Sequence, residues 1–192
     1  MKKKYKSVLQ LNSRVIEVSV RFEGEKWHGI DLKKLYETGL LLALEELNYP
    51  NNLYSTSVFA CEISTIKELN SQFLNNNEPT NVLSWPQIIY ERNLKTNFPN
   101  IPKEFFGNRK QIFLGDVAIS YEYCKEESVK LGVQLFEHFN RMVAHSILHL
   151  LGFDHYDERD AQIMQDLEVI LLSRVESDYQ QESNLEVNQS TR

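Results

Sequence analysis

Four stretches of the chain have the hydrophobic patterning or composition of β-strands. Residues 14–22 alternate largely between apolar and polar side chains, as a strand with one buried face does. Residues 54–63 and 111–120 are rich in β-branched and aromatic side chains. A shorter run at residues 82–84 is stopped by Pro86, and it predicts an edge strand because proline cannot donate a hydrogen bond to a neighbouring strand.

Between and after these strands, apolar residues recur at the spacing of amphipathic helices. The clearest helix is predicted at residues 31–48, with Asp31 as its cap and leucines along one face. Further helices are predicted at residues 64–73, with Ser64 as the cap, at 120–132, at 133–152, and from Asp157 onward, with Asp157 as the cap. This order of elements implies an α/β (α+β) domain, with a mixed sheet of about four strands packed against helices.

The chain of 192 residues fits a single domain, which we place at residues 13–175. Residues 1–12 are basic and lack a clear period, which predicts a flexible arm. The polar residues 176–192 predict a disordered tail. Within the domain, residues 87–110 are irregular and contain two prolines and a glycine, which is typical of an excursion or insertion.

Composition limits the partners and the location of the protein. The formal net charge of −6 argues against a general RNA-binding protein, because nucleic-acid affinity comes largely from Lys and Arg. No apolar run approaches the ~18 residues of a membrane span. No long apolar stretch or small-residue cleavage site follows the charged start, so we do not expect a signal peptide. The two cysteines have no metal-like spacing and suit a reducing compartment. We therefore expect a cytoplasmic protein that does not bind a membrane.

The strongest chemical signal is a histidine motif near the end of the predicted helix at 133–152. His145 and His149 are four residues apart, so they lie on one face of a helix. Gly152 can end the helix in a left-handed conformation, and the reversal could bring His155 back toward the other two. Three converging imidazoles leave a fourth position open, which is the arrangement of a catalytic zinc site on a zincin-like, histidine-rich helix.

The same histidine spacing occurs in zinc peptidases with the motif H-E-x-x-H-x-x-G-x-x-H. In those enzymes the Glu after the first His is the general base. This chain has Ser146 at that position, and a hydroxyl cannot accept a proton at neutral pH without help. A zinc peptidase is therefore the weaker hypothesis.

At these residues the chain resembles the YbeY family, whose motif reads H-G-x-L-H-L-x-G-[YF]-D-H. Only Ser146 departs from it, standing where the family has Gly. Residues 69–86 are similar to the family pattern L-N-x-x-[FY]-R-x-K-D-x-P-T-[ND]-V-L-S-F-P, and residues 114–120 match L-G-D-[IV]-x-[IL]-S. The resemblance implies a zinc-dependent endoribonuclease that matures the 3′ end of small-subunit (16S) ribosomal RNA and acts in ribosome quality control.

The resemblance also implies the site and the partners. One Zn2+ per chain would be held by His145, His149 and His155, and the partners would be ribosomal RNA and components of the small ribosomal subunit. Leu74 departs from the family pattern, because the family has Arg there and a guanidinium can clamp a phosphate. Arg141 lies four residues before His145 and is our candidate for the missing cation.

Besides the three histidines, we select four candidate cleft residues for catalysis: Asn81, Ser84, Arg141 and Asp154. Asp154 is interpreted as a carboxylate that orients a ligand histidine. An alternative to RNA cleavage is a zinc-stabilised ribosome assembly factor that binds without cutting, with zinc contributing chiefly folding energy. Leu74 and the net negative charge favour that alternative.

Overall fold

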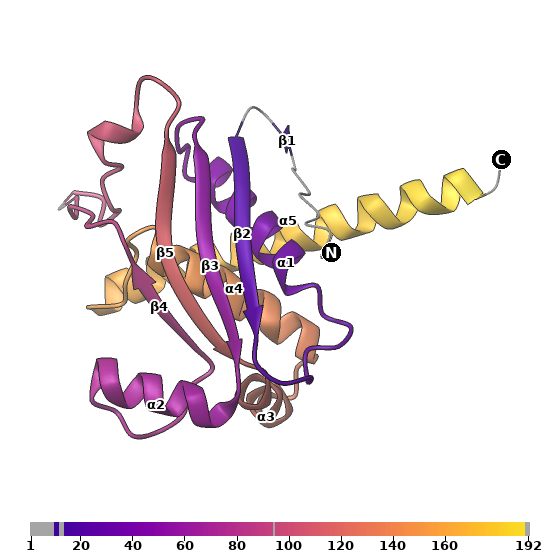
Figure 1. The fold of residues 1–192 in the computed structure, drawn as a ribbon. Coiled ribbons are helices and arrows are strands. Elements are labelled where there is room, and N and C mark those ends of the chain that lie inside the picture. Colours follow the sequence, from indigo (N-terminus) through magenta and orange to yellow (C-terminus); the bar gives the residue numbers. More distant parts are fainter. Residues whose placement is uncertain (1–9, 12–13, 94, 191–192) are drawn as a thin grey trace, which may run out of the picture.

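The computed structural model describes residues 10–11, 14–93 and 95–190, with side chains described for residues 14–93 and 95–175. Its centre is a mixed sheet with the strand order β1–β2–β3–β5–β4 (Figure 1). The strands are β1 (Gln10–Leu11), β2 (Arg14–Phe22), β3 (Leu53–Cys61), β4 (Val82–Pro86) and β5 (Gln111–Ser120). Strands β2, β3 and β5 are parallel, whereas β1 and β4 are antiparallel to their neighbours at the two edges. The predicted mixed sheet is confirmed, and the two-residue β1 is an addition to it.

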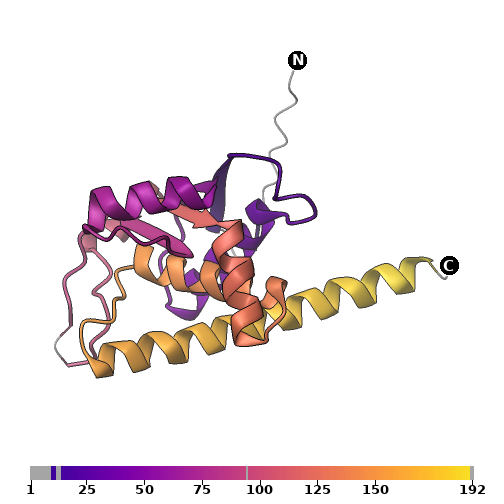
Figure 2. The same cartoon turned by 90° about the horizontal axis from the view of Figure 1, so that it is seen from below.

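Five α-helices and one short 3-10 helix accompany the sheet in the described part of the chain. They are α1 (Leu32–Glu46), α2 (Ile63–Leu74), η1 (Lys103–Phe105), α3 (Tyr121–Leu131), α4 (Leu135–Leu150) and α5 (Glu158–Ser190). Helix α4 contacts α1, α3, α5 and the strands β4 and β5. Helices α4 and α5 lie on one side of the sheet and α2 on the other (Figure 2). The sheet therefore has a helix layer on each face, and α4 is central to the larger layer.

The apolar core is divided in the same way. The main core lies between the sheet and the layer of α1, α4 and α5, and a smaller cluster beneath α2 consists of Cys61, Ile66, Leu83 and Ala118. Both cysteines are buried. None of the helices in the described residues is long and apolar enough to cross a membrane.

Capping side chains account for two helix starts. Asp31 and Asp157 each accept a hydrogen bond from the backbone N–H three residues later, as the sequence predicted. The predicted cap at Ser64 is wrong, because α2 begins at Ile63 and its cap position is Glu62. Strand β3 ends at Cys61, so the chain passes from strand to helix through a single residue and Ser64 falls inside the first turn.

The structure describes part of each predicted chain end. The predicted arm at residues 1–12 lies almost wholly outside the described residues, apart from β1. At the other end the backbone of α5 is helical as far as Ser190, where the sequence predicted a disordered tail from residue 176. The limits of the domain at residues 13 and 175 stay a prediction.

Candidate metal centre

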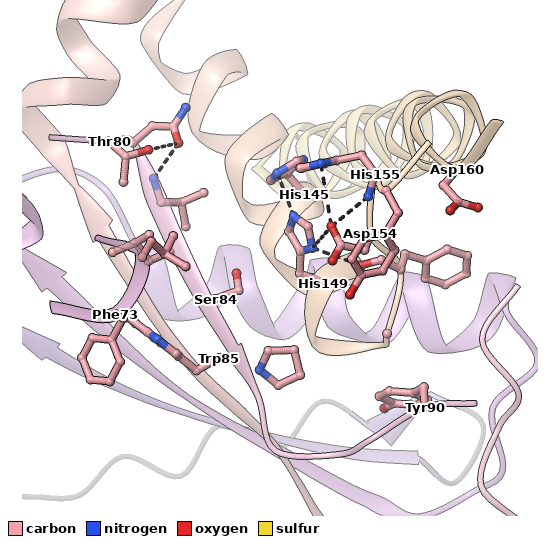
Figure 3. Close-up of a pocket in the computed structure, with 18 of the residues that line it drawn as sticks. Phe73, Thr80, Ser84, Trp85, Tyr90, His145, His149, Asp154, His155 and Asp160 are labelled. Carbon is pink, nitrogen blue, oxygen red and sulfur yellow. Dashed lines mark hydrogen bonds and ion pairs between the residues drawn. The ribbon is translucent and has the colours of Figure 1, made fainter. Parts of the chain in front are cut away.

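Three histidines converge where α4 ends and the chain turns back (Figure 3). One ring nitrogen from each of His145, His149 and His155 lies within 4.8 Å of the others. The turn has the hydrogen bonds of a Schellman motif, in which Phe153 N–H donates to the carbonyl of Leu148 over 3.0 Å. Gly152 provides the left-handed residue of this motif, with φ of 87°. Among the described residues, this is the one group of three or more His, Cys, Asp or Glu side chains close enough to hold a metal.

Gly152 is required for a second reason. A Cβ added at this position would lie 2.4 Å from Cγ of Tyr90, so the glycine allows the Tyr90 ring to pack directly against the turn. Phe98 also contacts the turn, with its ring centroid 5.4 Å from that of Phe153. Both aromatic residues belong to the irregular segment at 87–110, which therefore supports the loop that carries His155.

The hydrogen bonds around the first two histidines fix which nitrogen of each ring can bind a metal. Nδ1 of His145 is 2.7 Å from Oε1 of Glu168, and Nδ1 of His149 is 3.0 Å from the carbonyl oxygen of Phe153. Both partners are acceptors, so each Nδ1 carries the proton and each Nε2 presents a lone pair. The two Nε2 atoms are 3.1 Å apart. Two lone pairs at this distance repel each other, unless a cation lies between them.

The donor set fits zinc. Two nitrogens bound tetrahedrally at 2.0–2.1 Å from zinc are about 3.3 Å apart, close to the 3.1 Å between the Nε2 atoms of His145 and His149. Burial and the neighbouring His145 lower the pKa of His149 to about 4, so this ring is neutral and able to bind a metal at physiological pH. His155 is exposed and completes an open group of three.

The four candidate cleft residues lie at different places around the histidines. Ser84 and Asp154 line the same cavity as the histidines, a cleft of about 1000 Å³. Asn81 lines this cleft and a second cavity beside it, and its amide donates to Oε2 of Glu127 over 2.8 Å. Arg141 lines only the second cavity.

Asp154 lies close to two ligand histidines. Its Oδ1 is 3.7 Å from Nδ1 of His155 and 4.0 Å from Nδ1 of His149, and it accepts a hydrogen bond from the backbone N–H of His155 over 2.8 Å. The carboxylate thus holds the turn that carries His155, while the direct partner of His149 is the carbonyl of Phe153.

Arg141 is engaged with a carboxylate. Its Nε is 3.4 Å from Oε2 of Glu168, whose other oxygen accepts from His145. Arg141 therefore extends the hydrogen-bonded group that supports the first histidine. Leu74, which stands at the family Arg position, lines the main cleft and is 63% exposed.

Sequence reasoning missed Glu168, the partner of His145. It is buried on α5, 23 residues further along the chain, among the core residues Met164, Leu167 and Leu171. A carboxylate on the apolar stripe of a helix was the available signal, since an unpaired charge is rarely buried. The carbonyl of Phe153 had no such signal, because every residue has one.

The peptidase hypothesis loses support from the position of Ser146. This residue is fully buried, and its hydroxyl lies 2.9 Å from the Tyr36 hydroxyl and 2.9 Å from the carbonyl of Val143. The side chain is therefore engaged in the contact between α4 and α1 and is not available as a base.

An α+β domain with three histidines from one helix and its following turn, beside an open cleft, has the arrangement of a hydrolase whose site could hold a metal ion. A family model described as Endoribonuclease YbeY matches residues 17–176. The chain belongs to the YbeY endoribonuclease family, and the prediction of an enzyme is confirmed.

Individual relatives agree with this assignment. Endoribonuclease YbeY of Jannaschia sp. (strain CCS1) is 31% identical over 160 residues, which cover 83% of this chain and 96% of the relative. Endoribonuclease YbeY of Dinoroseobacter shibae is 34% identical over 155 residues, covering 81% of this chain and 84% of the relative. A solution structure from Thermotoga maritima matches with a TM-score of 0.54 at 20% identity, over 86% of this chain and 93% of that one, which supports the fold.

Proposed function

We propose that this protein is a zinc-dependent endoribonuclease that matures the 3′ end of small-subunit (16S) ribosomal RNA and acts in ribosome quality control in the cytoplasm. The observation that carries the proposal is the pair of Nε2 atoms of His145 and His149, which lie 3.1 Å apart beside an open cleft. Membership of an endoribonuclease family supports RNA as the substrate. The predicted partners are ribosomal RNA and components of the small subunit.

The residues of the site have separate roles in the proposed reaction. His145, His149 and His155 would hold the zinc, which when bound supplies Lewis-acid polarisation of a phosphoryl oxygen and lowers the pKa of water. Glu168 holds the ring of His145 in the orientation that the metal requires. Ser84 lines the cleft from the neighbouring strand β4 (Figure 3), and its hydroxyl donates to the carbonyl of Ser146 over 3.5 Å, so its oxygen can accept a hydrogen bond from RNA.

Cleavage of a small-subunit rRNA precursor tests the proposal. The zinc-loaded protein should cut the precursor, and a His149→Ala variant with measured loss of zinc should not. The experiment is run on free RNA and on small-subunit particles, because a protein with a net charge of −6 binds free RNA weakly and can depend on a docked substrate. No cutting of either substrate by fully zinc-loaded protein would refute the proposal.

A second candidate function is favoured by one observation in the cleft. Leu74 stands where the family has Arg, and the two arginines that line the cavities, Arg92 and Arg141, both bond to carboxylates. A zinc-stabilised assembly factor would bind small-subunit particles without cutting. It would co-sediment with these particles and lose stability on zinc removal. A Leu74→Arg variant would then be the test of whether the missing guanidinium is the cause.

A further inference from the structure

One wall of the main cleft is apolar and exposed. Phe73 and Leu74 come from the end of α2, Trp85 from β4, and Ile89 from the segment after β4. Phe73 is 58% exposed and Ile89 is 94% exposed, which is unusual for side chains of this size. We call Phe73, Trp85 and Ile89 the apolar wall. Phe73 and Trp85 lie on the α2 face of the sheet, where they also line a third cavity. They reach the main cleft at the edge strand β4, so an extended ligand that crosses this edge can contact the metal site and the wall together.

The wall is held in place by packing beneath it. The rings of Phe73 and Trp85 meet edge to face, with centroids 5.3 Å apart and an interplanar angle of 66°. Trp85 also packs against the small core cluster beneath α2. In Figure 3 the two rings lie on the same side of the cleft, with Ser84 on the strand between them and the histidines. The aromatic faces are therefore fixed before a ligand binds, which lowers the entropy cost of stacking.

The electrostatics of the cleft do not provide a substitute for this wall. Arg92 and Arg141 are the two Lys or Arg side chains among the described residues that line the main cleft and the second cavity. Arg92 is paired with Asp157 and Asp160, and Arg141 with Glu168. Several carboxylates line the same cavities. Apart from a bound metal, the main cleft and the second cavity thus offer phosphates few free positive charges. The cation nearest the wall is Arg21, which lines the third cavity with Phe73 and Trp85 and lies over the ring of Phe59.

We infer that the apolar wall is a base-stacking subsite, in which unpaired nucleotides of an RNA strand stack on Trp85 and Phe73 and contact Ile89 beside the metal centre. The inference rests on the proposed function, because continuity of the wall with the metal centre identifies the occupant as RNA. Stacking is tolerant of sequence, since every base has a π-face. It gives an acidic protein a way to hold RNA with little charge neutralisation.

Tryptophan fluorescence measures stacking directly. The chain has two tryptophans, and Trp27 is buried in the main core. In a zinc-loaded Trp27→Phe variant, binding of a 2′-O-methyl single-stranded oligonucleotide should quench the emission of Trp85. Binding without quenching would overturn the inference, while cleavage of RNA could still stand. If the protein neither binds the oligonucleotide nor cleaves RNA, the proposed function itself is refuted.

Affinity of the same oligonucleotide provides the second readout. Stacking on one side chain is worth about 1–3 kcal/mol, so Trp85→Ala should weaken binding about 5- to 150-fold. Trp85→Phe should retain most of the affinity. Because Trp85 packs on the small core, Phe73→Ala and Ile89→Ala serve as variants that leave this core intact, and each should weaken binding several-fold.

Phe106→Ala is the matched control, because Phe106 is 54% exposed and lines neither cavity. It should bind as the wild type does. Salt dependence distinguishes stacking from phosphate contacts, since each neutralised phosphate of a single strand contributes about −0.7 to the slope of log K against log salt. A slope of about −1.5 or shallower, meaning a weak dependence of affinity on salt, supports stacking. A slope steeper than about −3, with no effect of the wall variants, would overturn it.

Discussion

Glu168 should control the affinity of the metal centre although it is not itself a ligand. Its Oε1 accepts from Nδ1 of His145 over 2.7 Å, and its Oε2 lies 3.4 Å from Nε of Arg141. In a Glu168→Ala variant the His145 ring loses the acceptor that fixes its proton on Nδ1. The ring can then rotate or change tautomer, and its Nε2 no longer points reliably toward that of His149.

The expected loss of zinc affinity follows from the effect of similar hydrogen-bond partners in other metal sites. Loss of a hydrogen-bond partner behind a ligand histidine typically lowers metal affinity 10- to 100-fold, which corresponds to about 1.4–2.7 kcal/mol. Glu168→Gln should fall between the wild type and Glu168→Ala. Its amide oxygen can still accept a hydrogen bond from His145, but the negative charge that pairs with Arg141 is lost.

Competition with a chromophoric chelator at pH 7.5 measures zinc affinity without using RNA cleavage. Asp166→Asn is a suitable control, because Asp166 is an exposed carboxylate on the same helix and pairs with Gln162. Circular dichroism confirms that each variant is folded. A folded Glu168→Ala protein that binds zinc within twofold of the wild type would refute the role assigned to Glu168.

Three further predictions concern the supports of the site. Gly152→Ala should lower the free energy of unfolding by about 2–4 kcal/mol, because the new Cβ would clash with Tyr90 and the alanine would have to adopt a left-handed φ. An unchanged midpoint of denaturant unfolding would contradict this packing. As the pH falls from 6.5 to 4, the metal-free protein should lose roughly 3 kcal/mol of stability, because the pKa of His149 is lowered to about 4 in the folded protein and the unfolded chain binds the proton at higher pH. In a His149→Gln variant the plot of unfolding free energy against pH should be flatter over this range. Arg92→Ala should cost about 1–3 kcal/mol, since it removes a 2.7 Å partner from the buried Asp160. Hydrogen exchange of residues 91–93 and 96–100 should then rise, and unchanged protection would show that the pairing does not hold this segment.

The elements of the fold were largely predictable because their signals are local. Alternation predicted β2, and Asp31 predicted the start of α1, since strand period and capping depend on neighbours within a few residues. The wrong cap at Ser64 shows the limit of such signals. A capping residue is recognisable in sequence, but the end of the preceding strand depends on its pairing partner, β5.

The histidine site was predictable for the same reason. The spacing of His145 and His149 places them on one face of a helix, and Gly152 ends that helix whatever surrounds it. The family motifs then supplied the chemistry. The contribution of each candidate cleft residue to RNA cleavage stays a prediction.

The sequence by itself determined the strands, the helices and three histidines at ligand spacing, because these follow from helix and strand periods and from a glycine turn. The tertiary structure decided what surrounds them. Packing of α5 on α4 brings Glu168 to His145 and Arg141, and it engages the guanidinium that the sequence offered as a replacement at Leu74. Such contacts join residues far apart in the chain, and no local period encodes them.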